Sequence, residues 1–61
     1  MKATTNSGTY KVNKIGNSFF PVFQFNDGEV LFLGKSYGTE KGAEKRLKNH
    51  CDSANIKLSI N

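Results

Sequence analysis

The stretch Ser36-Tyr37-Gly38-Thr39-Glu40-Lys41-Gly42-Ala43-Glu44-Lys45-Arg46-Leu47 marks the change from sheet to helix in this chain of 61 residues. Before it, apolar residues recur with a period of about two, which is typical of strands. After it, they recur with a period near 3.6, which is typical of a helix. Thr39 is the expected N-cap, because its hydroxyl can accept a hydrogen bond from a free N–H group of the first turn. The stretch therefore predicts where a sheet ends and the single helix begins.

The predicted helix has one buried face. Its members recur at helical spacing; they are Ala43, Leu47, His50, Cys51 and Ala54. Asn55 can adopt the left-handed conformation that ends many helices. Gly42 lies in the first turn, although glycine costs about 1 kcal/mol inside a helix. This placement indicates that another part of the chain packs closely against it.

Three strand patterns precede the helix, at residues 9–15, 19–25 and 30–33. The first two are separated by the turn residues Gly16-Asn17-Ser18, which predict a hairpin. The second and third are separated by Asn26-Asp27-Gly28-Glu29, in which Asp-Gly suits positions that need a positive φ. The upstream half of the chain is therefore predicted to be a meander of antiparallel strands.

The two ends of the chain differ in pattern. Residues 1–7 are small and polar and are expected to form a flexible arm. Ile56 to Ile60 alternates apolar with polar residues, which predicts a final strand. The order is then β-β-β-α-β, so residues 8–61 are predicted to form a single α+β domain. Its antiparallel sheet carries one helix packed on one face.

The second predicted strand is apolar on both faces. Phe19 and Phe23 share one face, and Phe20 and Val22 share the other. One face should meet the helix, so the face with Phe20 and Val22 needs a second cover or a ligand. Pro21 has no N–H to donate to a ladder. Its nitrogen must therefore fall at an edge, at a bulge or beyond the end of the neighbouring strand.

The chain is small for an independent domain. A domain of this size buries only roughly 60% of the surface of its unfolded chain, and small domains often rely on a disulfide, a metal or a partner chain. Cys51 is the only cysteine and His50 the only histidine, which excludes an internal disulfide and a four-ligand zinc site. That leaves a partner chain or a well-packed single core. Of these we expect a homodimer, with candidate interface residues Phe20, Val22, Ile56, Leu58 and Ile60.

Short motifs on both sides of the turn into the helix resemble the YegP-like family of small domains. They are Phe19-x-x-x-Phe23, running into Asp27-Gly28-Glu29-Val30-Leu31, and Tyr37-x-Thr39-x-Lys41-Gly42-Ala43-Glu44. That family has a similar aromatic strand, an Asn-Gly-Glu-Val-type hairpin and a Tyr-Ser-x-Lys-x-Gly/Ala helix start. The resemblance covers Gly8 to Ala54; Pro21 and the loop Leu33-Gly34-Lys35 depart from the family pattern.

The resemblance implies an assembly. YegP-like domains occur as tandem repeats or as two separate chains, whose two β3-α-β units join into one sheet and exchange their C-terminal strands. A chain with a single unit resembles the homodimeric version. The family supplies no catalytic residues to transfer.

The charge of the chain favours acidic partners. Nine basic and five acidic residues give a net charge of +4, and basic surfaces bind polyanions through counterion release. The candidate polyanion-binding residues lie on and near the helix; they are Lys35, Lys41, Lys45, Arg46 and Lys48. The alternative explanation is an ordinary solvated helix face.

Catalytic chemistry finds little support in the sequence. His50 and Cys51 are adjacent on a helix and point about 100° apart, and the turn explains Asp27 and Glu29. We expect no enzyme activity, no cofactor, no metal and no membrane span, and a cytoplasmic location. Two functions remain: a non-enzymatic binding or regulatory homodimer that acts through protein contacts, and a nucleic-acid-binding protein. The latter would use the Lys-rich helix face or the aromatic sheet face.

Overall fold

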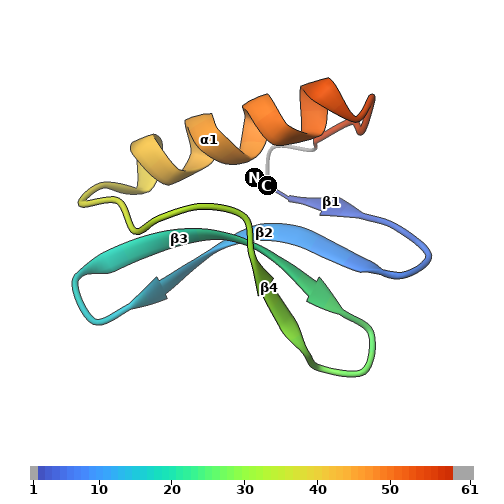
Figure 1. Cartoon of the computed structure of the whole chain (residues 1–61), viewed down its shortest axis with the longest axis horizontal. Coiled ribbons are helices and arrows are strands. Elements are labelled where there is room, and N and C mark those ends of the chain that lie inside the picture. Colours follow the sequence, from blue (N-terminus) through green and yellow to red (C-terminus); the bar gives the residue numbers. More distant parts are fainter. Residues whose placement is uncertain (1, 59–61) are drawn as a thin grey trace.

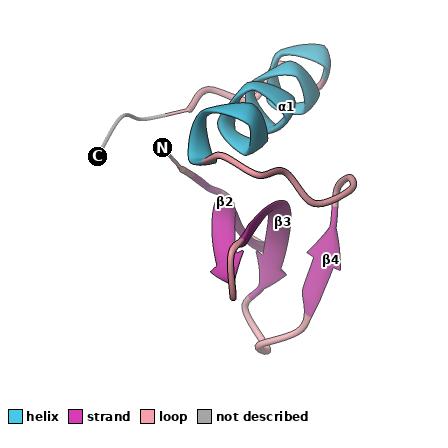
Figure 2. Ribbon diagram, turned by 90° about the vertical axis from the view of Figure 1, so that its left-hand side faces the viewer, coloured by secondary structure: helices cyan, strands magenta, loops and turns pink. Residues whose placement is uncertain are grey.

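The computed structural model describes residues 2–58. In this part of the chain a four-stranded antiparallel sheet, with strand order β1-β2-β3-β4, carries one helix on one face (Figure 1). The elements are β1 (Ala3–Thr4), β2 (Gly8–Ile15), β3 (Ser18–Phe25), β4 (Val30–Phe32) and α1 (Glu40–Ser53). The expected α+β class, with one helix on an antiparallel sheet, is thus confirmed. Figure 2 shows the two layers from the side, with α1 above β2 and β3.

A two-residue turn at Gly16-Asn17 fixes the register of β2 and β3. Gly16 takes a positive φ of 62°, as the first central residue of a tight hairpin turn requires. The pairing then runs from Ile15 opposite Ser18 to Gly8 opposite Phe25. Because directly opposite residues share a face, this register decides which side chains meet the helix and which face away.

The face toward α1 holds the central part of the core. Tyr10 and Phe23 are paired on this face, with ring centroids 4.5 Å apart. The buried helix residues Ala43, Leu47 and Cys51 recur every four positions and cover it. The opposite face, here called the open face, carries alternate residues of the strands: Thr9, Lys11, Asn13, Phe20, Val22, Gln24, Val30 and Phe32.

The β3–β4 connection is the predicted tight hairpin. Gly28 adopts a φ of 100°, and its N–H donates to the carbonyl of Phe25 at 2.9 Å. Asp27 accepts a hydrogen bond from the Glu29 N–H through Oδ1 at 3.0 Å. The Asp27 carboxylate and the Glu29 backbone therefore take part in the turn, in agreement with the interpretation of Asp27-Gly28 as turn chemistry.

Pro21 lies in the middle of β3 and marks the end of β4. The Leu33 N–H donates to the Pro21 carbonyl at 2.8 Å, but proline has no N–H to return the bond. Leu33 lies just beyond the last residue of β4, so the missing donor falls past the end of the neighbouring strand. The chain then leaves the sheet and returns at Tyr37, which exchanges two 2.8 Å backbone hydrogen bonds with Phe19.

Both ends of α1 are capped as the sequence predicts. Thr39 accepts a hydrogen bond from the Gly42 N–H at 3.2 Å through its hydroxyl. At the other end Asn55 takes a left-handed φ of 59°. The N–H groups of Asn55 and Ile56 donate to the carbonyls of Asp52 and Cys51 at 3.2 and 2.8 Å. These two bonds form a Schellman motif, which satisfies carbonyls that the helix leaves unpaired.

Two expectations about the chain ends need correction. Residues 3 and 4 of the expected flexible arm form β1: Ala3 pairs with Tyr10 and is only 5% exposed. A turn held by Thr5, whose N–H donates to the Gly8 carbonyl at 2.7 Å, brings them there. At the other end, residues 56–58 form no strand with the described sheet. Residues 59–61, including Ile60 of the expected final strand, lie outside the described part.

Candidate binding surfaces

The aromatic side chains of the open face form one cluster. Phe20 and Phe32 come from neighbouring strands, and their ring centroids are 5.1 Å apart at an interplanar angle of 51°. Val22 lies beside them and is fully covered, with 0% exposure. Val22, expected to be a contact residue, lies on the outer face but offers no exposed surface in the described chain.

Strand β4 is the most exposed apolar element of the sheet. Val30, Leu31 and Phe32 are 39%, 51% and 49% exposed, although all three are large and apolar. Leu31 faces the helix side of the sheet, opposite Phe23, whereas Val30 and Phe32 face the open side. The strand therefore presents apolar surface on both of its faces.

The outer edge of β4 also presents backbone groups. Leu33 and Glu29 point theirs toward β3, as their hydrogen bonds with Pro21 and Phe25 show. Backbone groups alternate in direction along an antiparallel strand, so those of Val30 and Phe32 point away from β3. Because β4 is the last strand of the described sheet, these groups are available to another strand.

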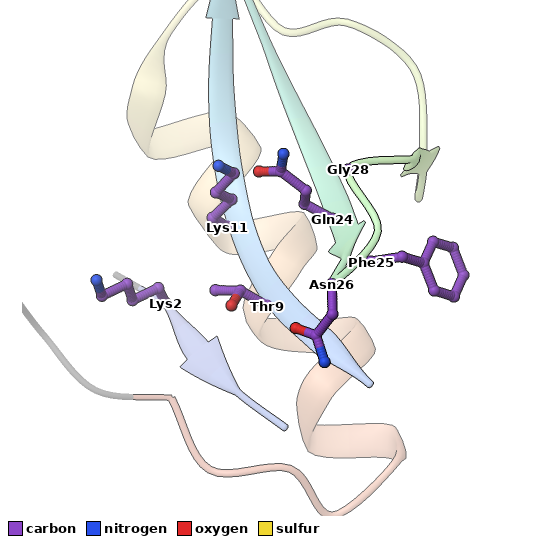
Figure 3. Close-up of a pocket in the computed structure, with 7 residues that line it drawn as sticks. All are labelled: Lys2, Thr9, Lys11, Gln24, Phe25, Asn26 and Gly28. Carbon is purple, nitrogen blue, oxygen red and sulfur yellow. The ribbon is translucent and has the colours of Figure 1, made fainter. Parts of the chain in front are cut away.

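A hollow of about 380 Å³ lies on the open face, between β1, β2 and the end of β3. Five of its lining residues are polar: Lys2, Thr9, Lys11, Gln24 and Asn26. Figure 3 shows the side chains of Lys2, Thr9, Lys11 and Gln24 on the same side of the strands, with the Phe25 ring pointing away from them. Asn26 is held in place, since its Nδ2 donates to the Asn6 carbonyl at 2.7 Å.

The sequence analysis did not single out Lys2 and Lys11 as binding residues. The position of Lys11 could have been predicted from the two-residue turn at Gly16-Asn17. That turn fixes the register, which places Lys11 opposite Val22 and therefore on the same face of the sheet. Lys2 could not be placed in this way, since its position depends on β1.

Charge is distributed unequally between the two sides of the molecule. All five acidic residues of the chain lie in the β3–β4 turn or on α1; they are Asp27, Glu29, Glu40, Glu44 and Asp52. Neither turn carboxylate lines the hollow. The open face is therefore cationic through Lys2 and Lys11, with no acidic side chain from the strands to offset them.

The basic helix residues lie on the other side of the molecule. Lys35, Lys41, Lys45 and Lys48 are exposed. Arg46 is half-buried, and its side chain lies beside Gly34. A Cβ added to Gly34 would be 3.4 Å from Nε of Arg46. Within α1 four basic residues are nearly balanced by three acidic ones. The helix and the open face cannot act as one continuous surface, because the sheet separates them.

The adjacent His50 and Cys51 do not form a nucleophilic site. Cys51 is 0% exposed, and burial, with a smaller contribution from Asp52, raises the pKa of its thiol. A raised pKa disfavours the reactive thiolate. His50 turns instead to Tyr10, with ring centroids 5.6 Å apart. Both side chains pack against the sheet.

Among the described residues, no group of three or more His, Cys, Asp or Glu side chains could hold a metal ion. Within residues 2–58, no helix has the length and apolar character needed to cross a membrane.

Comparisons of the chain with protein-family models, with curated proteins and with solved structures found no match. The function must therefore be inferred from the surfaces described above, and the resemblance to the YegP-like family rests on the motifs of the sequence.

Proposed function

We propose that the protein is a small non-enzymatic binding module that acts as a homodimer through β4 and regulates or recruits another protein. The observation that carries this proposal is the exposure of Val30, Leu31 and Phe32 on an edge strand with outward-pointing backbone groups. Such an edge is a template for pairing with another chain. The resemblance to YegP-like domains, whose units join into one sheet, supports the same assembly.

Two copies of β4 can pair antiparallel about a two-fold axis. The outward N–H groups of Val30 and Phe32 then donate to the outward C=O groups of the second copy, and their C=O groups accept from its N–H groups. The two four-stranded sheets become one continuous sheet, and both copies of Leu31 meet on the helix side. Exchange of the C-terminal strand, residues 56–60, is a further part of the proposal, and it rests on the resemblance to YegP-like domains.

The expected dimer is weak. Burying a large apolar side chain completely contributes about 1.5–3 kcal/mol. Val30, Leu31 and Phe32 are already about half buried, so six such side chains in two copies contribute roughly 5–9 kcal/mol. Association costs about 4–15 kcal/mol. We therefore expect an equilibrium between monomer and dimer that depends on protein concentration.

Sedimentation velocity over a range of protein concentrations tests the proposal. The wild-type protein should shift from monomer to dimer as concentration rises, and Leu31→Glu should stay monomeric because it places two carboxylates close to the two-fold axis. Ile15→Glu is the matched control: Ile15 is 54% exposed but lies at the far end of β2, so this variant should still dimerise. A chain ending at Leu58 should dimerise less if the terminal strand is exchanged.

A wild-type protein that stays monomeric at every concentration refutes the dimer. Equal loss of dimer in Leu31→Glu and Ile15→Glu places the interface elsewhere. Binding of a second protein is then tested by affinity capture with wild-type protein and Leu31→Glu as paired baits.

A further inference from the structure

The open face of the sheet carries a lysine and an exposed aromatic ring at the two ends of one cross-strand row. Lys11 on β2, Val22 on β3 and Phe32 on β4 are consecutive neighbours across the sheet. Adjacent strands are about 4.8 Å apart, so a cation and an exposed aromatic ring are anchored about 10 Å from each other. This spacing is comparable to the reach from a phosphate to the base of an adjacent nucleotide.

We propose that the open face binds single-stranded nucleic acid, with phosphates at Lys2 and Lys11 and a base stacked on the Phe32 ring. A four-stranded antiparallel sheet whose aromatic residues stack unpaired bases is an established mode of recognition. Single-strand platforms combine such rings with a cationic groove. The proposal does not depend on dimerisation: pairing through β4 would cover part of the Phe32 ring, so the monomer is the form that binds.

The aromatic half of the platform is preorganised. Phe32 is 49% exposed and rests against the ring of Phe20, while the buried Val22 supports both from the middle strand. One surface of the Phe32 ring is therefore held by the protein, and the exposed part is available to a base. Stacking on a fixed ring loses less conformational freedom than stacking on a mobile side chain.

The cationic half suits phosphate. Lys2 and Lys11 both line the hollow (Figure 3), together with Thr9 and Gln24, whose hydroxyl and amide can donate hydrogen bonds to phosphate oxygens or base edges. The acidic residues of the chain lie in the β3–β4 turn and on α1. A polyanion therefore meets no carboxylate from the strands on this face.

The occupant is a single strand and not a duplex or an acidic peptide. A duplex keeps its bases stacked inside, so they cannot reach Phe32. An acidic peptide satisfies the two lysines, but its carboxylates have no use for an exposed aromatic ring. The only Arg of the chain, Arg46, lies on α1, and bidentate contacts of Arg to guanine are the commonest base-specific contact. We therefore expect binding with little sequence preference.

Fluorescence anisotropy with labelled 12-nucleotide oligothymidine and oligouridine tests the proposal. The two oligonucleotides carry the same phosphates and pyrimidine rings and differ in the 2′-hydroxyl and the thymine methyl group, so the comparison shows which of the two the platform prefers. Each phosphate neutralised on a single strand contributes about 0.7 to the slope of log K against log salt. Lys2→Gln combined with Lys11→Gln should therefore lower the slope by about 1.4. Phe32→Ala should weaken binding roughly 5- to 150-fold, the range measured for the loss of one stacked base.

The matched control is Lys41→Gln combined with Lys45→Gln. It removes the same charge from the exposed face of α1 and should leave the slope unchanged. Leu31→Glu separates the two proposals: a monomer that keeps the Lys2- and Lys11-dependent slope supports the platform even where the dimer is absent. The proposal is overturned by no binding of either oligonucleotide, by equal effects of the two lysine pairs, or by equally tight binding of a matched duplex. Equal competition by polyglutamate at the same charge concentration also overturns it.

Discussion

Gly8 offers the most direct test of how closely β2 and β3 pack, because the neighbouring strand leaves no room for a side chain at this position. It is the first residue of β2 and is buried. A Cβ on Gly8 would overlap the carbonyl oxygen of Gln24 on the neighbouring strand and lie 2.8 Å from Cζ of Phe23. The carbonyl belongs to the sheet backbone and cannot rotate aside. Gly8→Ala must therefore move β2 away from β3 or displace the Phe23 ring from the core.

The expected cost is large relative to the stability of the domain. Forcing extra atoms into a packed site costs about 1–3 kcal/mol, and a rigid backbone neighbour places Gly8→Ala near the upper end, about 2–3 kcal/mol. A domain of 61 residues has a total unfolding free energy of roughly 3–9 kcal/mol. In a domain of this size each kcal/mol shifts the melting temperature by about 4–8 °C, which predicts a fall of about 8–24 °C.

Urea unfolding followed by circular dichroism measures this cost. All variants are compared at one low protein concentration, because dimerisation raises apparent stability. Gly38→Ala is the matched control: a Cβ there meets nothing within 4 Å, and its φ lies outside the left-handed region. Gly38→Ala should be neutral or stabilising by up to about 1 kcal/mol. A Gly8→Ala protein within about 0.5 kcal/mol of wild type would refute the close approach of β2 and β3.

Two further predictions concern α1. Thr39→Ala removes the acceptor of the Gly42 N–H and should lower the free energy of unfolding by about 1 kcal/mol, measured by urea titration; Thr39→Ser, which keeps a hydroxyl, should recover most of the loss. Burial raises the pKa of the Cys51 thiol in the folded chain, so the folded state keeps a proton that the unfolded state releases at high pH. The stability from this group is fully present below the ordinary thiol pKa and falls as pH rises above it. The difference in unfolding free energy between wild type and Cys51→Ala should therefore shrink at alkaline pH, and a constant difference would contradict this assignment.

The features predicted well from the sequence are those that depend on local chemistry. Thr39 caps the helix, Asn55 ends it in the left-handed conformation, and Gly28 supplies the positive φ of the second hairpin. The predicted close neighbour of Gly42 is also present: a Cβ there would lie 3.1 Å from Cδ2 of Tyr37. That neighbour is a ring, although a strand backbone was the suggestion made from the sequence.

The features that were missed depend on contacts between distant residues. Ala3-Thr4 has too few residues for a strand pattern, and it becomes a strand only because β2 offers an edge. Val22 follows the alternation that predicts an outward position, yet it is fully buried, between its cross-strand neighbours Lys11 and Phe32. The hollow beside Lys11 requires three strands in register, so no single segment could reveal it.

The order of the strands in the sheet is the same as their order in the chain. Each strand therefore pairs with its neighbour in sequence, across short turns that cost little closure entropy. Proteins rich in such local contacts fold in milliseconds or faster. On the ribosome, strand pairing can begin while α1 is still being synthesised, because every strand of the described sheet precedes the helix. Packing of Leu47 and Cys51 onto Tyr10 and Phe23 then becomes the last step, so the core closes only after α1 has left the exit tunnel.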